Sequence, residues 1–181
     1  PGTTGACGAT GFGPKKLQTC LAPYPGTDND IEGKVIVTFD EDTGDLTYKF
    51  RGVGLEESVE GAGTHIHSGT TCDDATLVGG HYWDKGPDGT IPDQWTAEYG
   101  AVYSTNARGN GKGSFTINSG YGFEENDLHA VVLHDSTGAR VGCGVLGKGK
   151  TGQCITPTKD KKLQACVTAY PGTNSTVSGK V

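Results

Sequence analysis

GKVIVTFDEDTGDLTYKF, residues 33–50, contains two runs of alternating apolar and polar side chains separated by a turn. In the first run Val35, Val37 and Phe39 fall on one face, because successive side chains of a strand point to opposite faces. The intervening DTGD, residues 42–45, is a hairpin signal that leads directly into the second run. The stretch therefore predicts a β-hairpin with one buried face.

The rest of the chain shows the same kind of pattern. Short apolar or alternating runs lie between clusters rich in Gly, Asp and Asn, which predicts eight strands. Eight short strands in one domain indicate an all-β fold, a sandwich or a barrel. Residues 69–97 show little strand pattern, and so long a loop in a compact domain is usually functional. The expected strands are residues 17–22, 32–39, 45–53, 62–68, 98–104, 113–118, 128–134 and 141–146.

Size and composition exclude several classes of protein. At 181 residues the chain has the size of about one domain, and its formal net charge of −6 argues against a nucleic-acid-binding protein. The longest uninterrupted aliphatic run, residues 130–133, is too short to span a membrane. Six cysteines without a C-x-x-C motif favour disulfides, and therefore a secreted or cell-surface protein. Asn174 begins an N-glycosylation sequon, which is consistent with secretion.

The two ends of the chain repeat each other. KKLQ at residues 15–18 recurs at 161–164, and YPGT at residues 24–27 recurs at 170–173 with the same offset. This regular register indicates a tandem array of domains, of which the chain covers one unit and the beginning of another. The expected organisation is a linker at 1–14, a domain at 15–148, a linker at 149–160 and the start of the next tandem repeat at 161–181.

The repeat also bears on the pairing of the cysteines. Cys7 precedes Cys20 much as Cys154 precedes Cys166, so the simplest arrangement has two local disulfides, Cys7–Cys20 and Cys154–Cys166. A Cys20–Cys154 bond is the alternative. The local arrangement leaves two cysteines whose disulfide would close a long loop and strongly restrict the unfolded chain, namely Cys72 and Cys143.

Five histidines are the candidate chemical groups. His65 and His67 are two residues apart on a predicted strand, so their imidazoles point to one face, where a single metal ion can bind both. Two exposed strand histidines are the alternative interpretation. His81 follows two glycines in the long loop, where the backbone lets its side chain approach a site. His129 and His134 should point to opposite faces of their strand, and we favour His134 as the ligand and His129 as a packing or hydrogen-bonding residue.

Five local motifs follow one another in a characteristic order over roughly residues 16–148: GTHIH at 63–67, Cys72, GH at 80–81, AVVLH at 130–134 and GARVGCGVLG at 138–147. Together they resemble the copper/zinc superoxide dismutase family. The last motif is the most specific, with an arginine, two residues and then Cys-Gly-aliphatic-aliphatic-Gly. The resemblance implies an eight-stranded Greek-key β-barrel, which agrees with the number of predicted strands.

The resemblance also implies roles for single residues. In that family the four matching histidines hold copper, the cysteine pair forms a disulfide within the subunit, and the arginine guides superoxide to the metal. The matching residues here are His65, His67, His81 and His134 for copper, Cys72 and Cys143 for the disulfide, and Arg140 for guidance.

Two departures from the family pattern concern the second metal and access to copper. The family holds zinc with further histidines, but no histidine lies between His81 and His129, so we expect zinc to be absent. Only five residues separate His134 from Arg140, where the family has a long charged loop, so we expect an open copper site. Both losses resemble the copper-only branch of the family, and the tandem organisation resembles its repeat proteins.

In the copper-only branch a glutamate orients the third copper histidine in place of zinc. We expect Glu98 to hydrogen-bond the non-ligating nitrogen of His81, because the second nitrogen of a ligating imidazole is usually held by a carboxylate or carbonyl. The rival carboxylates are Asp84, Asp88 and Asp93, and the alternative is that Glu98 is solvated.

The resemblance implies an extracellular enzyme that converts superoxide to O₂ and hydrogen peroxide at a single copper ion, with His81 shuttling a proton. The alternative function is a surface module that binds or stores copper, in which dismutation is incidental. The expected partners are superoxide and the neighbouring repeats. Residues 163–181 duplicate residues 17–35, which predicts strand exchange or edge-to-edge pairing with another copy.

Overall fold

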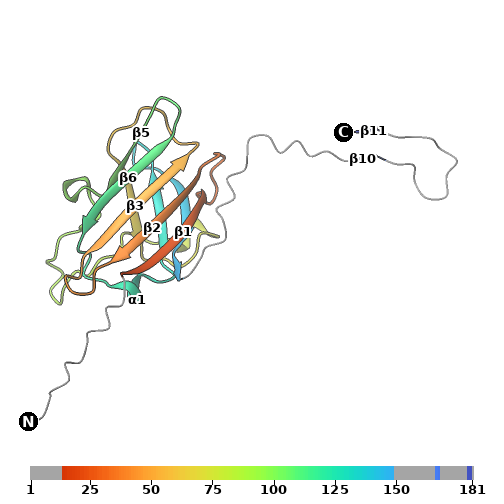
Figure 1. Ribbon diagram of the computed structural model, residues 1–181. Coiled ribbons are helices and arrows are strands. Elements are labelled where there is room, and N and C mark those ends of the chain that lie inside the picture. The colour runs from red at the N-terminus through yellow and green to blue at the C-terminus, as the bar shows by residue number, and fades with distance from the viewer. Residues whose placement is uncertain (1–13, 149–165, 168–178, 181) are drawn as a thin grey trace, which may run out of the picture.

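Eight antiparallel strands form a closed barrel in the computed structural model, which describes residues 14–148, 166–167 and 179–180 (Figure 1). The strands follow the order β2-β3-β6-β5-β4-β7-β8-β1, and β1 pairs back onto β2 to close the barrel. This order contains the long crossovers of a Greek key. The strands are β1 (Lys15–Pro23), β2 (Glu32–Phe39), β3 (Leu46–Val53), β4 (Ala62–His67), β5 (Val102–Thr105), β6 (Gly111–Ile117), β7 (Ala130–His134) and β8 (Arg140–Val145).

The expected all-β barrel is thus confirmed, and its first hairpin shows why the chain folds this way. Strands β2 and β3 pair over their whole length, from Glu32 opposite Val53 to Phe39 opposite Leu46. Val35 and Val37 are fully buried and Phe39 is 2% exposed, as their alternation predicts. They join a core that is built from the inward faces of the strands. Burial of this apolar surface is the main force that closes the barrel.

The remaining elements are short. Strand β9 (Gly147–Lys148) adds to β1, and the helical segments are η1 (Ala75–Leu77), η2 (Ala97–Tyr99) and α1 (Phe123–Asn126). The strand expected at residues 98–104 begins only at Val102, because η2 occupies its first positions and ends at Gly100 in the left-handed conformation. No helix in the described ranges is long and apolar enough to cross a membrane.

The disulfide Cys72–Cys143 is present, as predicted, and joins the long loop after β4 to β8. Cys20 is also disulfide-bonded. Of the other cysteines in predicted bonds, Cys7 and Cys154 lie outside the described part, and only the backbone of Cys166 is described. Asn174 of the sequon and the linker residues 1–13 and 149–160 also lie outside it.

Two further strands, β10 (Cys166–Val167) and β11 (Gly179–Lys180), form an antiparallel pair. Cys166 lies opposite Lys180, just as Cys20 lies opposite Lys34 in the barrel. The repeated sequence therefore has the same pairing register in both places. The tandem array and the exchange of strands between copies stay predictions.

Candidate metal centre

Strand β4 presents its side chains to two buried environments. Thr64 and Ile66 point into the barrel, where Ile66 joins the core and the Thr64 hydroxyl lies 2.6 Å from the Tyr48 hydroxyl. The alternate residues, His65 and His67, therefore lie on the outer side of β4, yet they are only 8% and 1% exposed. The long loop after β4 covers them.

Backbone pairing holds the loop against β4 and positions His81. His81 forms an isolated antiparallel bridge with His67. On either side of this bridge, the Ser68 N–H donates to the Gly80 carbonyl at 2.8 Å and the Tyr82 N–H donates to the Ile66 carbonyl at 2.9 Å. The loop thus adds one paired position to the edge of β4, which places the His81 ring beside the two strand histidines.

Strand β7 supplies the fourth histidine. Val132 lies directly opposite His65, so the two side chains share a face. His134 is two residues further along β7 and falls on the same face. It lies opposite Arg140 of β8, where the pairing register shifts after Leu133.

The four predicted ligands converge. One nitrogen from each of His65, His67, His81 and His134 lies within 4.8 Å of the other three, and the four form a group that could hold a metal ion. The ring centroid of His65 is 4.2 Å from that of His81 and 4.9 Å from that of His134.

The hydrogen bonds of the rings show which nitrogens face the centre. Nδ1 of His67 bonds to the Gly79 carbonyl at 3.0 Å, and Nδ1 of His134 bonds to the Gly138 carbonyl at 2.9 Å. A carbonyl only accepts, so each Nδ1 is protonated and each Nε2 carries a lone pair. Both of these Nε2 atoms are buried without a partner, and so is Nδ1 of His65. Buried polar atoms without a partner are costly, and a bound metal ion would satisfy all three.

Burial keeps three of the four rings neutral. Burial, reinforced by the charges of His81, His134 and His67, lowers the pKa of His65 to about 2. Burial also lowers the pKa of His67 to about 3, and it lowers the pKa of His134, with Arg140 adding to both effects. A metal needs the deprotonated nitrogen, so these rings are available as ligands at neutral pH.

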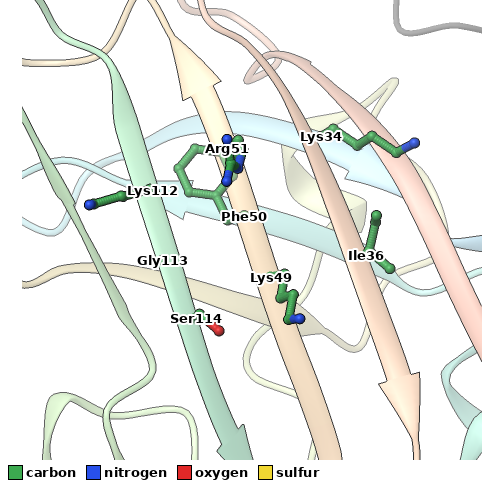
Figure 2. A pocket seen from close by; sticks show the side chains of 8 residues that line it. All are labelled: Lys34, Ile36, Lys49, Phe50, Arg51, Lys112, Gly113 and Ser114. Carbon is green, nitrogen blue, oxygen red and sulfur yellow. The ribbon is translucent and has the colours of Figure 1, made fainter.

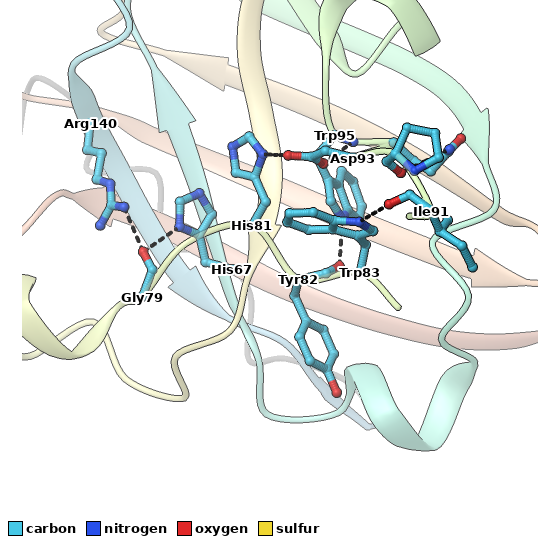
Figure 3. A network of polar contacts seen from close by, with 11 residues as sticks. His67, Gly79, His81, Tyr82, Trp83, Ile91, Asp93, Trp95 and Arg140 are labelled. Carbon is cyan, nitrogen blue, oxygen red and sulfur yellow. Dashed lines mark hydrogen bonds and ion pairs between the residues drawn. The ribbon is translucent and has the colours of Figure 1, made fainter. Parts of the chain in front are cut away.

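Asp93, and not Glu98, holds His81. The Asp93 carboxylate lies 2.6 Å from Nδ1 of His81 and also accepts the Trp95 backbone N–H at 2.8 Å (Figure 3). Glu98 is exposed on η2 and has no contact with His81, so the prediction for Glu98 is wrong. The prediction failed because it placed Glu98 on a strand, whereas the chain turns there as a 3₁₀ helix.

Trp95 explains why Asp93 is well positioned. Its ring is fully buried, and its indole N–H donates to the Tyr82 carbonyl at 2.7 Å. This bond ties Tyr82, the residue after His81, to Trp95, whose backbone N–H positions Asp93. From the sequence, Asp93 was only a rival to Glu98. The available signal was Trp95, a large apolar residue two positions after Asp93 that must be buried and so brings Asp93 close to the barrel.

Arg140 extends from the start of β8 toward the same site. One of its terminal nitrogens donates to the Gly79 carbonyl at 2.6 Å and the other donates to the Tyr24 hydroxyl at 3.0 Å. The Gly79 carbonyl also accepts from His67, so a single acceptor ties the guanidinium to a histidine of the cluster (Figure 3). Sequence analysis predicted the place of Arg140 but missed Tyr24, which is 116 residues away in the chain.

His129 lies beside the cluster and does not join it. Its Nδ1 is 3.1 Å from the His67 carbonyl, and its ring stacks on Tyr82 with centroids 3.8 Å apart. The prediction of a packing and hydrogen-bonding role for His129 is confirmed.

The centre therefore combines three imidazoles that burial keeps neutral, a fourth imidazole that Asp93 holds and a permanent cation at the edge. Such a set can bind a transition metal, and imidazole nitrogens suit copper and zinc among others. No protein-family model and no curated protein matches the chain. The fold and the cluster are shown by the structure, while the identity of the metal and the reaction belong to the proposal that follows.

Proposed function

We propose that the protein is a superoxide dismutase that uses one copper ion held by His65, His67, His81 and His134. The observation that carries this proposal is the set of three buried, unpartnered imidazole nitrogens that converge with His81 beside Arg140. Four nitrogen ligands in a tetragonal arrangement suit Cu(II). The order of motifs along the chain, which resembles the copper-only branch of the family, supports the same assignment.

The substrate is assigned from charge. Superoxide is a small anion, and the chain has a formal net charge of −6, so productive encounter requires local positive potential. Arg140 supplies it, because its charge reaches the cluster strongly enough to lower the pKa of His67 and His134. A guanidinium offers several N–H donors in a fixed plane, which suits the binding of an oxyanion.

A bound copper ion would supply one-electron exchange, by which one superoxide loses an electron to become O₂ and a second gains an electron and two protons to become hydrogen peroxide. The chain's own residues handle the anion and the proton. Asp93 fixes the direction of His81, whose side chain is 25% exposed and so can exchange a proton with solvent. His81 is therefore the residue placed to carry a proton, and we expect no zinc beside it.

The proposed location is extracellular. The Cys72–Cys143 disulfide is stable in an oxidising compartment, and superoxide released outside a cell would be the substrate there.

Two measurements test the proposed function. Metal analysis of the purified protein should count one copper and no zinc per chain. The copper-loaded protein should remove superoxide rapidly, and Arg140→Gln should lower the second-order rate about tenfold or more and weaken its dependence on salt. Arg108→Gln, which removes an exposed charge elsewhere, is the matched control. Tight copper binding without rapid superoxide decay would instead support copper storage.

A further inference from the structure

The outward side of the sheet formed by β1, β2, β3 and β6 is strongly basic. Five exposed cations lie at its outward-facing positions, and we call them the basic face: Lys16, Lys34, Lys49, Arg51 and Lys112. The barrel at residues 14–148 carries ten Lys and Arg but twenty Asp and Glu side chains, so half of its cations lie on one face of an acidic unit.

Three of these cations form a row. In the strand register Lys34 lies directly opposite Arg51, and Arg51 lies directly opposite Lys112 (Figure 2). Neighbouring strands are about 4.8 Å apart, so the row places like charges close together. Like charges at directly opposed positions destabilise a sheet.

No acidic side chain in the described residues forms an ion pair with the basic face. Glu32 is the one acid on the outward side of these four strands, and it lies at the end of β2 opposite Val53. Glu60 lies near Arg51 and Lys112 but accepts a hydrogen bond from Ser104. The repulsion within the row is therefore not offset by ion pairs within the barrel.

The surface beneath the cations is hollowed. A shallow groove of about 600 Å³ runs over β2, β3 and β6, and Gly113 and Ser114 line it beside the cations. Figure 2 shows four of the cations, Lys34, Lys49, Arg51 and Lys112, with Lys34 and Lys112 at opposite sides of Arg51. An extended, flexible chain that carries regularly spaced negative charges fits this surface better than a compact ligand does.

We propose that the basic face binds an acidic polysaccharide. The Cys72–Cys143 disulfide indicates an oxidising, extracellular setting, where sulfated and carboxylated polysaccharides are the abundant extended polyanions. Single-stranded nucleic acid is less suited, because it binds on exposed aromatic platforms and the outward positions of these four strands carry no aromatic side chain.

The basic face is separate from the histidine cluster. In the closed barrel the cluster depends on β4, β7 and β8, whereas β3 lies on the far side of the strand order from β7. A bound polymer would therefore hold the domain in a matrix and leave the metal centre accessible. Binding to the basic face needs no metal.

The test uses the full chain with two probes, dextran sulfate and polygalacturonate, and compares wild type with two triple variants of equal net charge. Lys34→Gln/Arg51→Gln/Lys112→Gln removes the row, and Lys85→Gln/Arg108→Gln/Lys148→Gln removes three cations elsewhere. The row variant should bind at least about tenfold more weakly in about 50 mM salt, and the control should change less than about twofold. A preference for either probe then identifies the sulfate or the carboxylate as the recognised group.

Several results would overturn the proposal. These are equal losses in the two triple variants, no binding of either polysaccharide by the wild type, and tighter binding of oligo(dT) than of a polysaccharide of equal charge. The row variant should also unfold at no lower temperature than the wild type, because it loses repulsion between like charges, and a lower temperature would contradict the idea that the row is strained. Superoxide decay should be the same in the row variant, so failure here leaves the proposed dismutase reaction standing.

Discussion

At the scale of single residues, the Gly79 carbonyl connects the histidine cluster to Arg140. It accepts one hydrogen bond from His67 and another from Arg140, so the same carbonyl fixes the direction of both side chains. Gly79 has a φ of 73°, and a Cβ there would lie 2.3 Å from the Ser68 hydroxyl. The left-handed backbone and this close approach both favour glycine at the position that provides the carbonyl.

The role of Asp93 gives the first residue-scale prediction. Asp93→Asn keeps the size of the side chain but removes the negative charge beside Nδ1 of His81. We expect copper affinity to fall about 10- to 100-fold, because partners that orient a ligating imidazole typically contribute that much. Competition with a chelator of known affinity measures the change. Glu98→Gln is the matched control and should have no effect, and equal losses in both variants would contradict the assignment to Asp93.

Tyr24 gives the second residue-scale prediction. Its hydroxyl accepts from Arg140 and donates to the Ala75 carbonyl, and Tyr24→Phe removes both bonds but keeps the buried ring. A net hydrogen bond contributes about 0.5–1.5 kcal/mol, so we expect the second-order rate of superoxide decay to fall about two- to tenfold, with weaker salt dependence. Copper affinity should not change.

The control for this variant is Tyr99→Phe, at an exposed tyrosine. Stopped-flow decay at several ionic strengths measures both variants. A Tyr24→Phe protein with the rate and salt dependence of the wild type would show that Tyr24 does not position Arg140.

The sequence predicted which histidines converge but not which groups hold their rings. H-x-H on a strand places His65 and His67 together by alternation alone, and the strand end places His134. The partners of these rings are set by contacts between distant segments, such as the one between Arg140 and Tyr24. No local pattern encodes such contacts, which explains why Asp93 remained one of several candidates.

At the scale of elements, the loop after β4 forms a cover that is fastened at two places. The Cys72–Cys143 disulfide fastens the loop to β8 near its start, and the bridge between His67 and His81 fastens it to β4 further along. The Gly69 N–H also donates to the Val78 carbonyl at 2.9 Å, which closes the loop on itself. The cover buries His65 and His67 because it is held against the barrel at both places.

The disulfide gives the element-scale prediction. Cys72→Ala/Cys143→Ala removes a link between residues that are 71 positions apart, so the unfolded chain gains freedom. We expect the free energy of unfolding to fall by about 2–4 kcal/mol, measured by urea denaturation. Wild type treated with a reductant is the comparison, and it should be at least as unstable as the variant, because reduction also breaks the bond of Cys20. Unchanged stability in both would contradict a structural role for this bond.

Elements with strong alternation were predictable, and those shaped by a turn were not. The hairpin of β2 and β3 follows from its pattern, since one buried face needs a period of two. The start of β5 could not be predicted from a pattern, because Ala97–Tyr99 fold as a 3₁₀ helix that ends at Gly100. Helical turns this short carry no periodic signal.

At the scale of the whole molecule, the closed barrel separates two surfaces of different chemistry. One side carries buried neutral imidazoles under a cover, and the far side carries the basic face in solvent. Eight strands could be counted from the sequence, but the Greek-key order joins strands distant in the chain, such as β3 with β6 and β1 with β8. That order came from family resemblance, since periodicity does not say which strands are neighbours.

The burial of the histidines makes the stability of the metal-free barrel depend on pH. His65 and His67 have pKa values of about 2 and about 3 in the folded protein, against about 6.5 in the unfolded chain. Because the folded pKa is the lower one, their contribution is complete above pH 6.5 and is lost as the pH falls toward the folded values. Between these limits the unfolded chain binds protons that the folded protein does not. The free energy of unfolding therefore falls by about 1.4 kcal/mol for each pH unit and each ring as the pH is lowered.

Metal-free protein should therefore lose up to about 4 kcal/mol of unfolding free energy between pH 6.5 and pH 5, measured by urea denaturation at each pH. Acidic side chains titrate mostly below this window, so the loss reports on the histidines. His65→Gln removes one of the two rings and should roughly halve the dependence of the unfolding free energy on pH. A metal-free protein equally stable at both pH values would show that the cluster does not exclude protons. Copper-loaded protein should resist acid further, because the metal occupies the nitrogens that protons would take.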